Sequence, residues 1–283
     1  MLFNSEAWQG LNAKDITLIE NIDHQVMKTI CNGHSKTPIE FYYLETGAKP
    51  LKQILASRRI MYLHHILGRE DGKLVKRVFI TQRDNPTSGD LVELVKKDLE
   101  DIGIAYDEEE KIKQYKIQFK LYIKEKLKIA ALKELKDRQA SHSKVRDIVY
   151  SELKIQTYMT SNKFTNQMVN VLFNLQSSMT RNIKANFSSL FKENMFCKLK
   201  CKEKDIDTQQ HLWSCSELLK SLTLTEIENT NAVNYNDIFG SLQQQRLVVQ
   251  ALARLLEIRD QLLEEECLPV GLITGPTTAV TNL

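Results

Sequence analysis

Hydrophobic residues recur at three- and four-residue steps along most of this chain, which is the pattern of amphipathic helices. The first predicted helix covers residues 12–31, and its apolar positions are Ile16, Ile19, Ile22, Val26 and Ile30. Asn32 and Gly33 follow it, and both residue types readily adopt the left-handed conformation that ends a helix. A short helix is predicted at 39–44 and a stronger one at 51–67.

The middle of the chain holds the longest helical pattern. Residues 74–80 form a compact apolar run, for which periodicity leaves helix and strand both open. Asp90 is placed to cap a helix over 91–102. The longest predicted helix covers 107–139, and its apolar positions are Ile112, Tyr115, Phe119, Ile123, Leu127, Ala130 or Ala131, and Leu135.

The second half is predicted to be helical on both sides of a cysteine-rich segment. A helix is expected over 162–183, then the cysteine segment at 196–216, then a final helix over 241–266. The apolar stripe of that last helix is Leu247, Val248, Ala251, Leu255, Ile258 and Leu262. A change of composition near Ser151 suggests two parts, 1–150 and 151–266, followed by a loose uncharged tail at 267–283.

Composition supports a mainly all-α fold. The 283 residues include only 10 Gly and 5 Pro, too few for the closely spaced turns of a β-sandwich or barrel. No stretch of about 18 apolar residues is present, so we expect no membrane span. The first residues lack the pattern of a signal peptide, and the five cysteines are an odd number. We therefore expect an intracellular protein with reduced thiols, in either the nucleus or the cytoplasm.

The sequence contains no intact catalytic signature. Residues 68–73 resemble a phosphate-binding loop only superficially, because the loop is one residue too short and Leu74 replaces the hydroxyl residue that would hold magnesium. No two aspartates are adjacent, whereas two-metal nucleotidyl transfer needs clustered carboxylates. We therefore predict a protein that is not an enzyme and has no small-molecule substrate.

The sharpest local signal is the spacing Cys197-x3-Cys201-x9-His211-x3-Cys215. Three thiolates and one imidazole satisfy tetrahedral zinc, so the spacing predicts one structural Zn²⁺ ion. His211 and Cys215 are one helical turn apart, which predicts that both face the ion from a single helix. The alternative is that the segment simply has three buried cysteines and a surface histidine.

Positive charge is concentrated in one stretch. The whole chain has a net charge of +3, but residues 111–146 carry ten Lys and two Arg against three acids, a net +9. Such a surface suits the phosphates of RNA or DNA, although a lysine-rich helix is also ordinary solvated surface. The candidate contact residues are Arg58, Arg59, Lys113, Lys116, Lys120, Lys124, Lys128, His142 and Lys144.

Several segments together resemble the region that follows the polymerase palm in reverse transcriptases of LINE-type (non-LTR) retrotransposons. Their order carries the resemblance, which spans about residues 1–216. The segments are LFNSEAW at 2–8, TPIEFYYLETGA at 37–48, RRIMYL at 58–63, QRDNPTSGD at 82–90, HSK at 142–144, QTY at 156–158 and the cysteine–histidine cluster.

The resemblance implies a helical thumb-like region, a linker and a C-terminal zinc knuckle that together grip template RNA and target DNA. Arg58 and Arg59 match the paired arginines of the thumb, and the four predicted zinc ligands match the knuckle. The catalytic aspartates of the palm would precede residue 1, so we expect a non-catalytic fragment: a truncated or domesticated copy, or part of a longer polypeptide. The alternatives are a helical protein-interaction module using helices 107–139 and 241–266, a polymerase whose palm is another chain, and a remnant without function.

Overall fold

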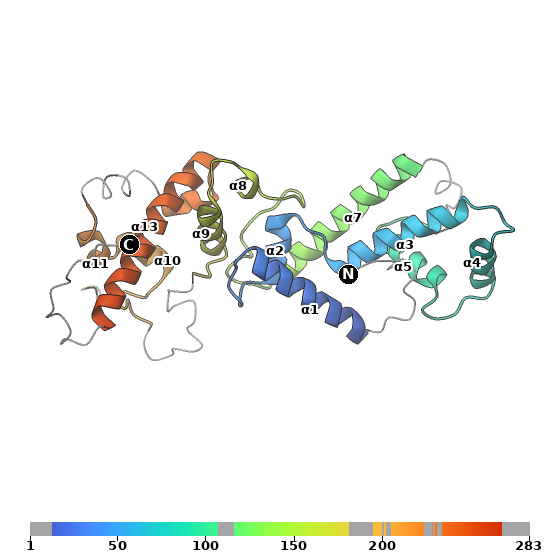
Figure 1. Cartoon of the computed structure of the whole chain (residues 1–283), viewed down its shortest axis with the longest axis horizontal. Helices are drawn as coiled ribbons and strands as arrows, with labels where there is room; N and C mark the ends of the chain where they lie inside the picture. The colour runs from blue at the N-terminus through green and yellow to red at the C-terminus, as the bar shows by residue number, and fades with distance from the viewer. Residues whose placement is uncertain are drawn as a thin grey trace, which may run out of the picture. The chain divides into compact units, whose positions relative to one another are not determined.

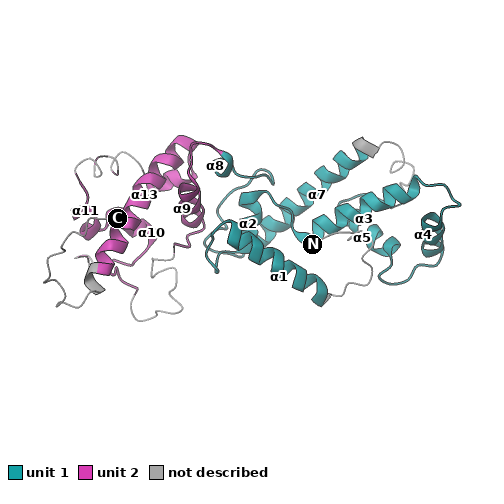
Figure 2. Ribbon diagram, in the orientation of Figure 1, with its two compact units in different colours: residues 1–160 teal, residues 161–283 magenta. Residues whose placement is uncertain are grey.

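The computed structural model describes residues 13–106, 116–180, 195–199, 201, 205–223, 228, 230 and 234–267. Within these residues the chain is mainly helical, and its only β-structure is a pair of isolated bridges, Thr46 with Ile155 and Phe196 with Ile206 (Figure 1). The predicted all-α fold is confirmed. The chain divides into two compact units, residues 1–160 and 161–283 (Figure 2).

Backbone conformation and side-chain capping account for several helix ends in the first unit. Asn32 ends the first helix with a φ of 44°, and Gly47 ends the second with a φ of 65°. The Asp90 carboxylate caps a later helix by accepting a 2.8 Å hydrogen bond from the Glu93 N–H. The helices are α1 (Ala13–Ile30), α2 (Ile39–Thr46), α3 (Leu51–Leu67), α4 (Leu74–Asp84), α5 (Leu91–Asp101), α7 (Lys116–Gln139) and α8 (Thr157–Thr160).

Two apolar segments of this unit are partly exposed. The run at 74–80 is helical, as the first part of α4, and it buries Phe79 while Leu74 and Val78 stay exposed. In α1, Ile22 and Val26 of the apolar stripe are exposed, whereas Ile16 and Ile19 are half-buried. The helix buries Met27, which lies close to Ile16 around the helix axis, so the side that packs is rotated from the centre of the apolar stripe.

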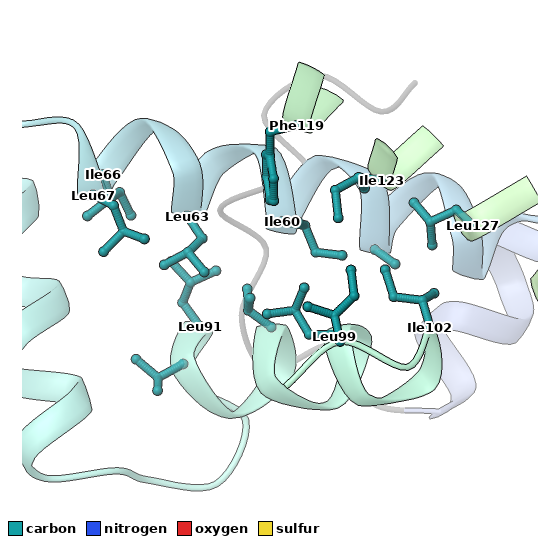
Figure 3. Packing of buried hydrophobic residues seen from close by; sticks show 14 of the residues in the cluster. Ile60, Leu63, Ile66, Leu67, Leu91, Leu99, Ile102, Phe119, Ile123 and Leu127 are labelled. Atoms are coloured by element: carbon teal, nitrogen blue, oxygen red, sulfur yellow. The ribbon is translucent and has the colours of Figure 1, made fainter. Parts of the chain in front are cut away.

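The core of the first unit lies between α3, α5 and α7 (Figure 3). Each helix contributes one stripe of aliphatic side chains, and burial of each such side chain is worth about 1.5–3 kcal/mol. Because this stripe fixes the rotation of α7, the lysines between its apolar positions are directed away from the core. The central residues are Ile60, Leu63 and Ile66 of α3, Leu91, Val95 and Leu99 of α5, and Phe119, Ile123 and Leu127 of α7.

The first unit extends ten residues beyond the predicted boundary at 150. Residues 151–160 pack against the end of α2, because the Gln156 N–H donates to the Glu45 carbonyl at 2.8 Å. The Tyr158 hydroxyl also donates to the Glu45 carboxylate at 2.7 Å. These contacts join residues more than a hundred positions apart, which no local composition shift reveals.

The second unit contains α9 (Asn166–Gln176), α10 (Gln209–Ser214), α11 (Ser216–Lys220), the 3₁₀ helix η3 (Tyr235–Phe239) and α13 (Leu242–Cys267). The helix predicted from residue 162 begins four residues later. Thr165 caps it by accepting a 3.2 Å hydrogen bond from the Met168 N–H, and the preceding residues form a turn. It ends at Gln176, because Ser178 adopts a φ of 54°.

The predicted C-terminal helix is confirmed as α13, with a slightly rotated apolar side. Leu247 is exposed rather than buried. The residues that the helix buries are Val248, Val249, Leu252, Leu255 and Ile258. The predicted tail beyond Cys267 lies outside the described residues, as do positions 107–115 of the basic helix. None of the described helices combines the length and the apolar character needed to cross a bilayer.

Candidate metal centre and basic surface

The four predicted ligands lie together in the second unit and form a buried group that can hold a metal ion. The ligand atoms of Cys197, Cys201, His211 and Cys215 all lie within 4.8 Å of one another. The two sulfurs of Cys197 and Cys215 are 3.8 Å apart, and the Cys201 sulfur is 3.5 Å from Nε2 of His211. Residues separated by up to 18 positions therefore converge on one point.

A short antiparallel pairing positions the first cysteine. The Cys197 N–H donates to the Asp205 carbonyl at 2.8 Å, and the Asp207 N–H donates to the Met195 carbonyl at 2.8 Å. These two hydrogen bonds flank the bridge between Phe196 and Ile206. We call these paired residues, 195–197 and 205–207, the knuckle hairpin.

The histidine is held from two directions. Thr208 caps α10 by accepting a 3.0 Å hydrogen bond from the His211 N–H, which fixes the backbone of the first turn. Nδ1 of the His211 ring lies 3.3 Å from the Asp205 carboxylate. A carboxylate at one ring nitrogen orients the imidazole and favours the tautomer whose other nitrogen can bind a metal. Nε2 is that other nitrogen, and it faces Cys201.

The prediction that His211 and Cys215 share one helix is wrong. Helix α10 ends at Ser214, and Cys215 adopts an extended conformation (φ −65°, ψ 116°) before α11 begins. This break leaves the N–H groups of Leu218 and Glu217 directed at the Cys215 sulfur. The hydrogen bond from Cys197, assisted by these N–H groups, lowers the pKa of Cys215. A lowered pKa favours the thiolate, which is the form that binds metals.

The lysines of α7 occupy the predicted surface only in part. Lys120 and Lys124 are exposed, and Lys128 is half-buried with its Nζ 3.4 Å from Glu152. Lys113 and the side chain of Lys116 lie outside the described residues.

A lysine that sequence reasoning missed joins this surface. Lys49, in the turn between α2 and α3, has a lowered pKa, first because of burial and then because of the charges of Lys124 and Lys128. We call these three residues the lysine cluster. Lys49 is 75 residues from Lys124 in the sequence, so no local pattern connects it with α7.

The paired arginines of α3 have separate environments. Arg59 makes a bidentate ion pair with Asp98, with N···O distances of 2.7 and 2.8 Å, and both side chains are largely buried. Its guanidinium therefore joins α3 to α5, and a phosphate would have to compete with a carboxylate for it. Arg58 is half-buried on the same helix.

The last two predicted contact residues follow α7. His142 lies 3.3 Å from the carboxylate of Glu40. The pKa of Lys144 is lowered by burial and by the nearby charge of Lys36. Lys144 and Lys36 thus form a second, smaller concentration of positive charge in the first unit.

No family model, curated protein or solved structure matches the chain. The class that the fold and site define is a mainly helical protein with a buried group of three cysteines and one histidine. Its resemblance to retrotransposon reverse transcriptases is carried by the sequence segments alone, and it stays a prediction.

Proposed function

We propose that this chain is a non-catalytic nucleic-acid-binding protein with one structural zinc ion held by Cys197, Cys201, His211 and Cys215. The spacing of the ligand atoms carries the zinc assignment. A tetrahedral site with Zn–S bonds of about 2.3 Å and Zn–N bonds of about 2.0–2.1 Å has S–S edges of about 3.8 Å and S–N edges of about 3.5 Å. The sulfurs of Cys197 and Cys215 are 3.8 Å apart, the Cys201 sulfur is 3.5 Å from Nε2 of His211, and all four ligand atoms lie within 4.8 Å of one another.

The donor set favours zinc and a structural role. Thiolate and imidazole ligands in a tetrahedron suit Zn²⁺, whereas calcium and magnesium take oxygen ligands in larger coordination shells. Four protein ligands fill the tetrahedron, and all four residues are buried. Such a closed site has no position for a reacting water, which is why we assign it to folding rather than to catalysis.

Nucleic-acid binding is supported by the exposed charge of α7 and by the lysine cluster. Burial lowers the pKa of Lys49 most, and repulsion by the charges of Lys124 and Lys128 lowers it further, although Glu125 opposes the shift. A phosphate group placed among the three lysines would relieve that repulsion and release condensed counterions from the nucleic acid. RNA and DNA both carry the phosphate groups that this surface would bind. The same proposal includes a retroelement origin, in which a longer polypeptide supplies the polymerase palm.

The alternative is a helical protein-interaction module. The apolar stripe of 241–266 is largely buried within the second unit as part of α13, so it is not available to a partner. Exposed apolar side chains lie on α7, at Leu121, Tyr122 and Ile129, and on α1, at Leu18, Ile22, Val26 and Ile30.

Two measurements test the proposed function. Elemental analysis of protein purified without added metal should find one zinc per chain, and protein that keeps its structure without metal would contradict the assignment. Gel-shift assays at low salt should detect complexes with RNA or DNA. An apparent affinity that is undetectable with both would remove the binding proposal, and primer extension by this chain alone would contradict the non-catalytic assignment.

A further inference from the structure

A fully buried ion pair joins the knuckle hairpin to the last helix. Nη2 of Arg259, on α13, lies 2.7 Å from the carboxylate of Asp207, and the two side chains are 0% and 1% exposed. Arg259 is among the largest fully buried side chains of the described residues. A buried guanidinium is tolerated only when it is paired, so the Asp207 carboxylate supports the packing of α13 at this position.

The position of Asp207 depends on the residues around the metal centre. Its backbone N–H pairs with Met195 in the knuckle hairpin, two residues from Cys197. The next residue, Thr208, caps the turn that holds His211. Asp207 therefore lies within a segment whose two ends are metal ligands, and a small segment of this kind folds mainly through its metal.

We propose that the Arg259–Asp207 ion pair couples metal occupancy to the packing of α13, so that loss of the ion releases the part of this helix around Arg259. The inference depends on the proposed zinc site. When the ion leaves, the hairpin loses the constraint that positions Asp207, and the Arg259 charge is left buried without its carboxylate. Water can reach that charge only if this part of α13 moves away from α10.

The two ends of α13 are expected to respond differently. Near its start, Gln245 donates a 3.2 Å hydrogen bond to the Ile238 carbonyl of η3. Gln176 of α9 donates to the same carbonyl at 2.6 Å. These contacts involve no residue of the knuckle hairpin, so we expect them to hold the first half of α13 with or without metal. The released half would expose Leu252, Leu255 and Ile258, which makes zinc occupancy a switch for an apolar surface.

Hydrogen exchange on the full chain, followed by mass spectrometry, tests this coupling. The zinc-loaded protein is compared with protein stripped by a chelator and with stripped protein given zinc again. We expect amides of residues 252–264 to exchange at least tenfold faster without zinc and to recover when zinc returns. Residues 242–250 and helix α3 should change by less than threefold.

Variants identify the ion pair as the cause. The double substitution Arg259→Met with Asp207→Leu replaces the pair by apolar side chains, and we expect residues 252–264 to stay protected without zinc. Arg254→Met is the matched control, because Arg254 is an exposed arginine on the same helix, paired with Glu257. It should respond to zinc as the unmodified protein does.

The outcomes separate this inference from the proposed zinc site. Zinc content is measured on the same samples. If zinc is bound and removable while residues 252–264 exchange at an unchanged rate, the coupling is wrong and the zinc site stands. The coupling is also wrong if residues 252–264 of the folded double variant still lose protection when zinc is removed. If the protein binds no zinc at all, both proposals fail together. Should the double variant not fold, hydrogen exchange of the unmodified protein with and without zinc still decides whether the coupling exists.

Discussion

The carboxylate of Asp205 lies 3.3 Å from Nδ1 of His211, on the opposite side of the ring from the nitrogen that faces Cys201. This arrangement makes Asp205 the residue that orients the histidine for a metal, although it is not itself a ligand.

The first prediction concerns that orientation. Asp205→Ala should weaken zinc binding by about 10–100-fold, because the ring loses the partner that fixes its tautomer. The zinc affinity of Asp205→Asn should lie between that of Asp205→Ala and that of the unmodified protein, since the amide oxygen still accepts a hydrogen bond. Competition with a coloured chelator measures the affinities. Equal affinity for all three proteins would show that the carboxylate has no such role.

The second prediction tests the ligand set. Cys215→Ser should abolish stoichiometric zinc and destabilise the second unit, because the site loses one of its three thiolate ligands. Cys31→Ser is the control, since Cys31 is a buried cysteine of the first unit with no part in the cluster. It should keep one zinc per chain. Elemental analysis and thermal unfolding followed by circular dichroism report both effects, and retention of zinc by Cys215→Ser would contradict the site.

A buried carboxylate of the first unit gives a prediction about pH. Burial raises the pKa of Glu45 to about 7, although hydrogen bonds from Tyr150 and Tyr158 oppose the shift. The folded state therefore holds the proton more tightly than the unfolded chain, whose glutamate pKa is about 4.3. The stabilisation is fully present below the unfolded pKa and is lost as pH rises to about 7, by up to about 3 kcal/mol.

Glu45→Gln should remove this pH dependence. Urea unfolding at pH 5 and pH 8 measures the free energy of unfolding of both proteins. We expect the variant to lose less stability than the unmodified chain between these two pH values, because an amide does not titrate. If the two proteins have the same pH dependence, Glu45 does not titrate in this range.

The paired arginines of α3 should separate into a structural and a surface residue. Arg59→Met leaves Asp98 buried without its partner and should lower the free energy of unfolding by about 3 kcal/mol. Arg58→Met should change stability much less. If nucleic-acid affinity falls with Arg58→Met at unchanged stability, Arg58 is the contact residue. Equal destabilisation by the two changes would contradict the division of roles.

Local features of this fold could be predicted from sequence, whereas long-range pairings could not. Asn32, Gly47 and Asp90 end or cap helices through their own backbone preferences and side chains, so their roles are visible in a few residues. The convergence of the four ligands followed from their spacing. Arg59 and Asp98 are 39 residues apart and Arg259 and Asp207 are 52 apart, and nothing local links either pair.

The differences between the predictions and the structure have distinct physical causes. A spacing of four residues between His211 and Cys215 fits one helix, but the chain breaks at Cys215 so that backbone N–H groups can reach its sulfur. The boundary at 150 was placed by composition, whereas the contacts of Gln156 and Tyr158 with α2 set it at 160. Local hydrogen bonds accompany the first position, and tertiary hydrogen bonds accompany the second.

The central claim, that the chain binds nucleic acid through its basic surface, is tested most directly by the salt dependence of binding. Fluorescence anisotropy with a labelled single-stranded RNA and a labelled DNA duplex gives the affinity between about 50 and 200 mM salt. We predict a linear fall of log K with log salt. For the double variant Lys49→Gln with Lys124→Gln, we predict weaker binding and a slope reduced by about 1–2. Lys97→Gln, an exposed lysine of α5, is the control and should keep the slope. Salt-independent binding, or equal slopes for all three proteins, would contradict the account.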